Sequence, residues 1–251
     1  MRIAFISDIH ANLTALRAVL ADIDSQKVDQ VISLGDTVTL GPQPLEVLST
    51  LRDLKCVYIK GNHDEAILDP DHAVDYQIAD HLLPDLYWCR DRLNREDLEF
   101  INSFRASYEF TFPNGVSVLS YHGSPESSTD LILATTPTEI LDKHFENRNA
   151  DVFIGGHSHI QMHRRHGDKL ILNSGSVGNA FAYAYEPGSV PSLLPWAEYA
   201  ILSQYGQSLN VDLRRVYFDT DELLKLVSES RLPGAEWWSR QYKNQPESWN
   251  A

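Results

Sequence analysis

Short apolar runs in this chain stop repeatedly at a polar residue that can bind a metal or move a proton. RIAFIS (2–7) leads to Asp8, VDQVISLG (28–35) leads to Asp36, and KCVYIKG (55–61) leads to Asn62. Segments with apolar residues at helical spacing separate these runs, over 13–23 and 44–54. Alternating strands and helices predict an α/β fold with parallel pairing, in which such polar residues gather at the carboxyl edge of the sheet.

The second half of the chain is rich in predicted strands. Residues 108–112 and 116–123 flank a Pro-Asn-Gly turn and predict a hairpin, and DVFIGG (151–156) reads as a buried strand. Further strands are expected within 162–173 and 198–217, with a helix around 137–146. We therefore expect a central sheet or two facing sheets, with helices outside.

Two segments are predicted to be helical additions to this core. Residues 65–104 carry apolar residues three and four apart, which favours a packed helical layer over a substrate cap. We expect one domain over 1–218 that includes this layer, and a helical appendage over 219–251. Its Trp237 and Trp238 are expected to dock onto the same chain, although exposed apolar pairs also mark contacts between subunits, so an oligomer stays open.

Composition excludes several classes of partner and location. The 251 residues carry a formal charge of -14, which argues against nucleic acid and against an anionic membrane surface as partners. The apolar runs are shorter than the roughly 20 residues that a spanning helix needs, and MRIAFISDIH does not resemble a signal peptide. Cys56 and Cys89 show no metal-binding spacing. We expect a cytoplasmic protein.

Eight polar residues follow predicted strands and include the candidate ligands of a metal site. They are Asp8, His10, Asp36, Asn62, His63, His122, His157 and His159. Each short motif alone would be incidental, but together they predict a shared site. Carboxylate and amide oxygens with imidazole nitrogens suit manganese, iron or zinc, and the lack of thiolates argues against a closed structural zinc site. Two ions with one bridging carboxylate would leave room for a bridging water that attacks a phosphoryl group.

The ordered motifs resemble those of the calcineurin-like metallophosphoesterases, in particular the small bacterial phosphoesterases. The motifs are DIH (8–10), GD (35–36), GNHD (61–64), HG (122–123) and GHSH (156–159), and the resemblance covers roughly residues 1–180. It implies two facing mixed sheets flanked by helices, and two divalent metal ions, which could be manganese, iron, zinc or nickel. It also implies hydrolysis of a phosphate ester by a metal-bridging hydroxide.

The resemblance also implies a role for each motif residue. One metal would be held by Asp8, His10 and His159, the other by Asn62, His122 and His157, with Asp36 between them. His63 would contact the substrate and either protonate the leaving group or stabilise the transition state, although a helix-capping imidazole is the alternative. Asp64 is expected to cap a helix or to orient His63.

The substrate-binding residues are less well defined by the sequence. GDTVTLG (35–41) lacks the Asp and Arg that protein phosphatases carry in this motif, which makes phosphoproteins doubtful substrates. Asn12 is expected either to bind a phosphate oxygen or to cap the following helix. Phe181, Tyr183 and Tyr185 are candidate walls of a pocket, with ordinary packing as the alternative.

We therefore expect a phosphoesterase that acts on a phosphodiester or on a nucleotide-like small molecule. A phosphomonoesterase with the same mechanism is the first alternative. A metal-binding scaffold and a nucleotide-binding module without turnover are alternatives from another class. The motifs fix the reacting centre, whereas substrate preference and metal identity depend on loops that the sequence does not place in space.

Overall fold

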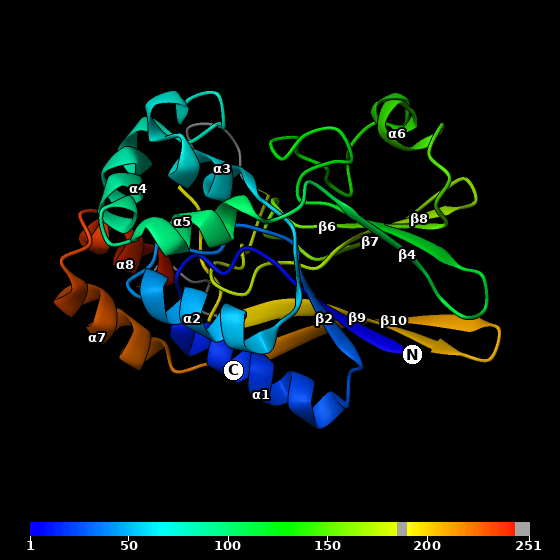
Figure 1. Ribbon diagram of the computed structural model, residues 1–251, viewed down its shortest axis with the longest axis horizontal. Coiled ribbons are helices and arrows are strands. Elements are labelled where there is room, and N and C mark those ends of the chain that lie inside the picture. The colour runs from blue at the N-terminus through cyan, green and yellow to red at the C-terminus, as the bar shows by residue number, and fades with distance from the viewer. Residues whose placement is uncertain (185–189, 244–251) are drawn as a thin grey trace.

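Within residues 1–184 and 190–243, which the computed structural model describes, the strands form two five-stranded sheets that face each other (Figure 1). The first sheet has the order β10-β9-β1-β2-β3. Its strands are β1 (Arg2–Ile6), β2 (Gln30–Ser33), β3 (Val57–Tyr58), β9 (Trp196–Tyr205) and β10 (Ser208–Tyr217). Strands β1, β2 and β3 are parallel, whereas β9 runs antiparallel to β1 and to β10.

The second sheet has the order β4-β5-β6-β8-β7. Its strands are β4 (Tyr108–Thr111), β5 (Ser117–Ser120), β6 (Val152–Gly155), β7 (Met162–His166) and β8 (Lys169–Asn173). Strands β5, β6 and β8 are parallel, and the edge strands β4 and β7 pair antiparallel with their neighbours. Both sheets are therefore mixed, as the resemblance implied.

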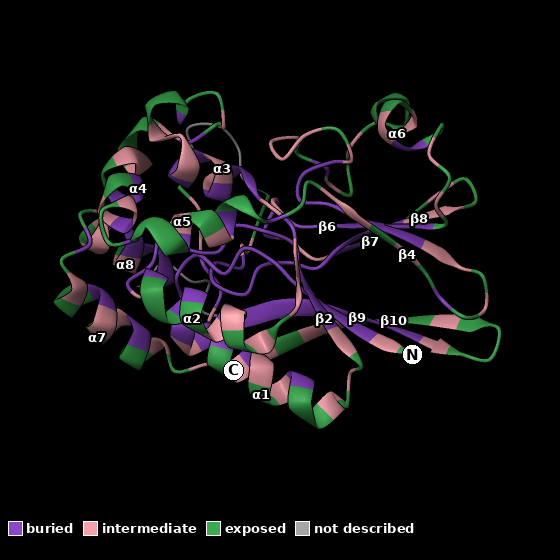
Figure 2. Cartoon of the chain, viewed as in Figure 1, coloured by how far each residue is buried: buried purple, intermediate pink, exposed green. Residues whose placement is uncertain are grey.

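Alternation along β1 explains how the first sheet is covered on both faces. Ile3 and Phe5 point into the space between the sheets, where they join an apolar cluster that includes Ile154 of the second sheet. Ala4 and Ile6 point the other way, towards the helices. Because side chains alternate across a strand, a run that is apolar at every position must be buried on both sides. Figure 2 accordingly shows the central strands mostly buried.

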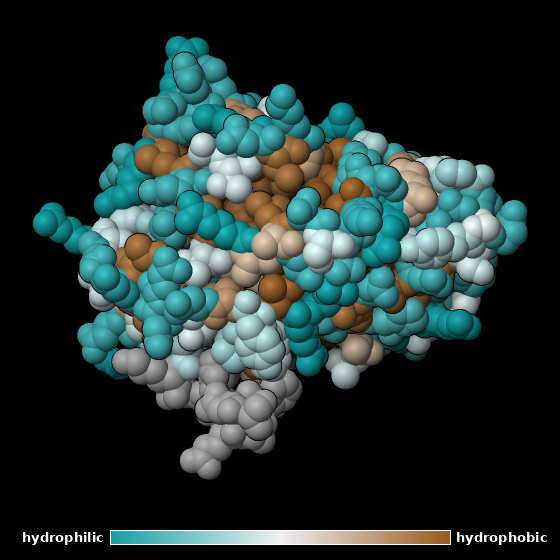
Figure 3. Space-filling view, turned by 90° about the horizontal axis from the view of Figure 1, so that it is seen from below, coloured by the Kyte–Doolittle hydropathy of each residue, from teal (hydrophilic) through white to brown (hydrophobic). Residues whose placement is uncertain are grey.

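Helices cover the outer faces of both sheets. Helices α1 (Leu13–Gln26) and α2 (Pro44–Leu54) pack on the first sheet, and α6 (Thr138–Phe145) packs on the second sheet. The face seen from below is mostly hydrophilic at its rim, with hydrophobic residues gathered towards its centre (Figure 3). No helix within the described ranges is long and apolar enough to cross a membrane.

The predicted helical layer is present but is interrupted. It consists of α3 (Asn62–Leu68), α4 (Leu83–Arg90) and α5 (Arg95–Asn102), with 3₁₀ turns at Pro70–His72 and Asp80–Leu82. Ile67, Leu86 and Ile101 join its apolar cluster, so packing is its main contact.

The C-terminal segment folds back onto the rest of the chain. Helices α7 (Thr220–Ser230) and α8 (Ala235–Lys243) share an apolar cluster with Leu193, and Trp238 in that cluster is buried. The tryptophan pair therefore docks within the chain, as expected. The rest of the predicted appendage, 244–251, lies outside the described residues.

Asn12 joins the start of α1 to a loop that is distant in the sequence. Its Oδ1 accepts a hydrogen bond from the Ala15 backbone at 3.0 Å, and its Nδ2 donates to the Gly178 carbonyl at 3.1 Å. The side chain is completely buried. Capping is thus the role that the contacts support, and we do not retain Asn12 as a candidate substrate contact.

The double role of Asn12 predicts an unusually large loss of stability in Asn12→Ala. We expect the free energy of unfolding to fall by about 2 kcal/mol, because a buried cap is lost together with one of the two hydrogen bonds that the Gly178 carbonyl accepts. Asp219→Ala is the matched control, since Asp219 caps α7 through one exposed bond, from the Glu222 backbone. Denaturant unfolding measures both variants, and equal losses would contradict the second role of Asn12.

Candidate metal centre

The predicted ligands lie in loops that follow parallel strands of both sheets. Asp8 and His10 follow β1, Asp36 follows β2, Asn62 and His63 begin α3 after β3, His122 follows β5, and His157 and His159 follow β6. In Figure 1 these loops lie where the strands give way to the helices α3, α4 and α8. The facing sheets thereby bring residues from distant parts of the chain to one place.

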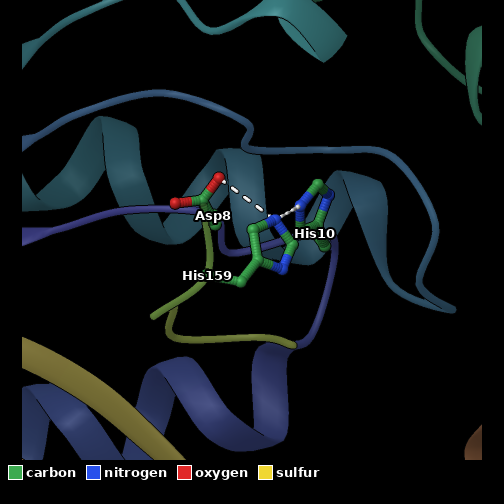
Figure 4. Close-up of side chains that lie close together, drawn as sticks. All are labelled: Asp8, His10 and His159. Carbon is green, nitrogen blue, oxygen red and sulfur yellow. Dashed lines mark hydrogen bonds and ion pairs between the residues drawn. The ribbon is translucent and has the colours of Figure 1, made fainter. Parts of the chain in front are cut away.

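Three groups of side chains among the described residues could hold a metal ion, and two of them lie in this site. Asp8, His10 and His159 form the first of these two (Figure 4). The Nε2 atom of His159 lies 3.1 Å from Nε2 of His10 and 3.3 Å from Oδ1 of Asp8. The Nδ1 atom of His159 donates to the Asn179 carbonyl at 2.8 Å. In the neutral ring this bond leaves the Nε2 lone pair facing the other two side chains.

Asp36, His122 and His157 form the second group. The Nδ1 atom of His122 donates to the Leu34 carbonyl at 2.7 Å, which directs Nε2 towards the group. That Nε2 lies 3.4 Å from Oδ2 of Asp36 and 3.2 Å from Oδ1 of Asn62. The amide oxygen of Asn62 therefore lies where a ligand was predicted.

The two groups are continuous because their carboxylates lie between the imidazoles. Oδ2 of Asp36 is 3.8 Å from Nε2 of His10, a member of the first group. Oδ1 of Asp8 is 3.9 Å from Nε2 of His122, a member of the second group. Two ions held here would be close neighbours, and Asp36 is within reach of both groups.

Asp64 fixes the loop that carries Asp36. Its carboxylate accepts hydrogen bonds from the backbone of Asp36 at 2.8 Å, of Gly61 at 3.0 Å and of Thr37 at 2.9 Å, and from the Thr37 hydroxyl at 2.6 Å. The bond from Gly61 is the expected helix cap. The orienting role expected towards His63 is wrong, since these contacts hold Asp36 instead. A Cβ on Gly61 would lie 2.1 Å from Oδ1 of Asp36, so only glycine fits there.

Five of the candidate ligands have left-handed backbones. Their φ angles are 52° for Asp8, 48° for His10, 57° for Asp36, 67° for His157 and 58° for His159. Residues other than glycine rarely adopt such angles, which cost of order 1–3 kcal/mol each. Strain concentrated in this way is typical of functional sites, because it aims side chains before a ligand arrives.

The buried carboxylates of the site depend on neighbouring imidazoles for charge compensation. Burial opposes ionisation of the completely buried Asp8, but His159 and His122 outweigh it and lower the pKa of Asp8 to about 2. Burial also opposes the charge on His122, but Asp36 and Asp8 raise the pKa of its imidazole to about 10. Burial lowers the pKa of His157 to about 4. The two carboxylates thus hold the His122 imidazole in its charged form.

The donor atoms fit divalent metal ions. Oδ1 of Asp8 is buried and has no hydrogen-bond partner among the residues that the structure describes. A carboxylate oxygen without a partner is costly in a protein interior, and a cation at this point would satisfy it. Carboxylate oxygens and imidazoles without thiolates suit manganese, iron, zinc or nickel.

His63 lies beside the two groups. Its ring makes an edge contact with His10, with centroids 5.0 Å apart. Its Nδ1 is buried and lacks a partner within the described part of the chain, and burial lowers the pKa of the imidazole. An imidazole placed in this way can exchange a proton with a bound ligand. At the position where protein phosphatases would carry Asp, the Oγ1 atom of Thr39 lies 3.4 Å from Nδ1 of His10.

A largely apolar cavity of about 280 Å³, which we call the chamber, opens onto these residues. Its lining includes Asp36, Asn62, His63, His157 and His159, and also Leu40, Leu131, Phe181, Leu193, Trp237 and Trp238. Phe181 is thus a wall, as predicted. Tyr183 is 64% exposed and is not part of the lining, and Tyr185 lies outside the described residues. Sequence reasoning missed the contribution of α8, for which the only signal was the tryptophan pair.

Metal binding near pH 7 should release about one proton per chain. His122 is protonated at that pH because its pKa is about 10, whereas His157, with a pKa of about 4, is already neutral. An imidazole binds a metal only after it loses its proton, so the affinity for manganese should fall as the pH falls. Calorimetry in two buffers of different ionisation enthalpy measures the release. It should disappear in His122→Asn, and its absence in the wild type would contradict this charge balance.

Comparisons with known proteins agree with this geometry. The family model of the calcineurin-like phosphoesterase superfamily domain matches residues 1–189. The chain is 30% identical over 246 residues to an uncharacterized protein of Methanocaldococcus jannaschii, with 94% of each chain covered.

Solved structures show the same fold. A metallophosphoesterase from Sphaerobacter thermophilus is similar with a TM-score of 0.74 and 27% identity, over 96% of this chain and 98% of that chain. A hypothetical protein from Pyrococcus horikoshii OT3 has the same fold, with a TM-score of 0.79 and 21% identity over 95% and 96% of the two chains. The family match over residues 1–189 shows that the chain belongs to the calcineurin-like phosphoesterase superfamily.

Proposed function

We propose that the protein is a dinuclear metal-dependent phosphoesterase that hydrolyses a phosphodiester or a nucleotide-like small phosphate ester. The observation that supports this most directly is the pair of adjacent ligand groups around the buried Oδ1 of Asp8, which lies 3.3 Å from Nε2 of His159 in one group and 3.9 Å from Nε2 of His122 in the other. Family membership supports hydrolysis of phosphate esters in general. A phosphomonoester is the alternative substrate.

The proposed ligands follow the two groups. Asp8, His10 and His159 would hold one ion, while His122, His157 and Asn62 would hold the other. Asp36 would serve both ions, since its carboxylate lies near Nε2 of His10 and of His122. The chemistry of the donors does not choose among manganese, iron, zinc and nickel.

Bound divalent ions would supply an activated water and positive charge for the phosphoryl group. Residues of the chain would position the substrate and transfer the proton. The His63 imidazole faces the chamber and would give a proton to the leaving oxygen or stabilise its charge. The hydrogen bond from the His63 backbone to Oδ1 of Asp36, at 2.9 Å, links this residue to the proposed shared ligand. The bond therefore holds the start of α3, which carries His63, against the Asp36 carboxylate.

The direct experiment measures hydrolysis of bis-p-nitrophenyl phosphate and of p-nitrophenyl phosphate by metal-stripped protein, with and without manganese. We expect turnover only with the metal, and the better substrate ranks diester against monoester. Metal-loaded protein that turns over neither ester nor a panel of nucleotides would contradict the proposal and favour a binding module or a scaffold.

His63→Ala should retain the metals and lower kcat by about 10²–10⁴-fold, the range typical of a lost proton donor. Metal content by elemental analysis and kcat with bis-p-nitrophenyl phosphate measure the two effects. His72→Ala is the control, because His72 is exposed and pairs with Asp69 away from the site. An unchanged kcat in His63→Ala would rule out the assigned role.

Asp36→Asn should weaken the binding of both ions together. The substitution removes the negative charge at the point where the two groups meet, and its amide nitrogen cannot act as a ligand. Manganese titration followed by calorimetry counts the sites that are lost. Loss of a single site would show that Asp36 serves only one ion.

A further inference from the structure

The chamber is built partly from a segment that the family model does not include. That model ends at residue 189, whereas Leu193 and three residues of α8, Trp237, Trp238 and Gln241, line the same cavity as His63. The walls that surround the leaving group are therefore formed in part by the C-terminal region. Specificity commonly resides in such added walls, because the reacting centre itself is shared across a fold.

Aromatic rings lie along the chamber, beginning at the metal ligands. The Phe181 ring lies 4.4 Å from the ring of His159, measured between centroids. The Trp237 ring lies 4.9 Å from the ring of His81, and both residues belong to the lining. Trp237 is only partly buried, so part of its ring surface is available for stacking. Planar rings are the ligands that such surfaces bind well.

Two buried polar atoms on α8 lack partners. Nε1 of Trp238 and Oε1 of Gln241 have no hydrogen-bond partner among the described residues, although these side chains are only 3% and 2% exposed. Nε2 of Gln241 donates to the Trp237 carbonyl at 2.7 Å, which fixes the orientation of the amide. One donor and one acceptor, three residues apart on a helix, therefore lie on the same face. Buried polar groups of this kind ordinarily have partners.

Hydrogen bonds anchor α8 to the rest of the domain. The Gly234 backbone donates to Oδ1 of Asp85 at 2.6 Å, just before the helix begins. The Tyr242 hydroxyl donates to the Gly178 carbonyl at 2.9 Å, beside the loop that carries Asn179. Asn179 in turn accepts the bond from His159. The wall is therefore fixed relative to the metal centre.

The chamber offers no side-chain cation. Among the described residues that line it, none is Lys or Arg. A leaving group that carries further phosphates would have no counter-charge there, beyond that of the metal ions and the histidines. The lining instead suits a leaving group that is neutral, planar and able to form hydrogen bonds at its edge.

We propose that the chamber binds the nucleobase of a nucleoside leaving group, with Trp237 as a stacking surface and with Trp238 Nε1 and Gln241 Oε1 as partners for the edge of the base. A base such as adenine presents an acceptor beside a donor, which complements this pair. This inference rests on the proposed phosphoesterase function and deepens it to nucleotide esters.

The test compares ligands that differ only in what they carry beside the phosphate. Calorimetry with manganese-loaded protein measures the Kd of adenosine 5′-monophosphate, ribose 5-phosphate, phenyl phosphate and inorganic phosphate. We expect adenosine 5′-monophosphate to bind at least about tenfold more tightly than ribose 5-phosphate, given the usual strength of stacking on a base. Phenyl phosphate should bind between the two, because it has a ring without donor or acceptor groups.

Variants of α8 assign the preference to named atoms. Trp237→Leu should raise the Kd of adenosine 5′-monophosphate about tenfold and change the Kd of ribose 5-phosphate by less than about twofold. Trp238→Phe keeps a ring but removes the N–H. It should raise the Kd of adenosine 5′-monophosphate about three- to tenfold and leave the Kd of phenyl phosphate unchanged. Arg240→Gln is the control on the same helix, since Arg240 is exposed and pairs with Glu236. Thermal unfolding establishes that each variant is folded.

The outcomes separate this inference from the proposed function. Equal binding of adenosine 5′-monophosphate and ribose 5-phosphate would overturn the nucleobase site, even if hydrolysis of model esters is observed. If phenyl phosphate binds as tightly as adenosine 5′-monophosphate, the chamber binds a simple aryl group and the nucleobase proposal is wrong. If none of the phosphates binds, hydrolysis of the model esters tests the proposed function separately, while adenosine against ribose with metal-free protein still tests the chamber. There too, adenosine should bind more tightly, and Trp237→Leu should remove the difference.

Discussion

The structure of the site depends on two carboxylates, Asp8 and Asp36, that are buried close together where the sheets meet the helices. Burying a charge is costly unless an opposite charge or several donors compensate it. Without a metal, the imidazolium of His122 supplies part of that compensation. Oδ1 of Asp8 has imidazole neighbours but still lacks a hydrogen-bond partner among the residues described. Divalent cations would satisfy this arrangement, and much of the surrounding hydrogen bonding keeps the two carboxylates in place.

The apolar burial between and around the two sheets offsets the free-energy cost of this arrangement. Left-handed residues in the loops, a third buried carboxylate at Asp64 and closely packed imidazoles all cost free energy. The apolar cluster between the sheets, which includes Phe5 and Ile154, and the helices on the outer faces supply the compensating burial. Because the ligands follow strands from both sheets, packing of the sheets also sets the spacing of the metal site.

The sequence predicted the reacting centre better than its surroundings. Every proposed metal ligand follows a strand, so period and position were enough to select these residues as candidates, and the structure brings them together. The resemblance to a known family separated His63 from them. The role of Asp64 was not predictable, since its partners at Asp36 and Thr37 lie 28 and 27 residues away. The same holds for Trp237 and Gln241, because only tertiary packing brings α8 to the chamber. Asn12 was correctly seen as a cap, but its bond to Gly178 spans 166 residues.

The most direct test of the central claim is the number and position of metal ions in crystals of manganese-loaded protein, measured by anomalous scattering. The account predicts two peaks roughly 3.5–4 Å apart, a spacing typical of dinuclear hydrolytic sites. One peak should lie among Asp8, His10 and His159, and the other among Asn62, His122 and His157, with Asp36 between them. A single peak, or two peaks that do not share Asp36, would contradict the dinuclear centre.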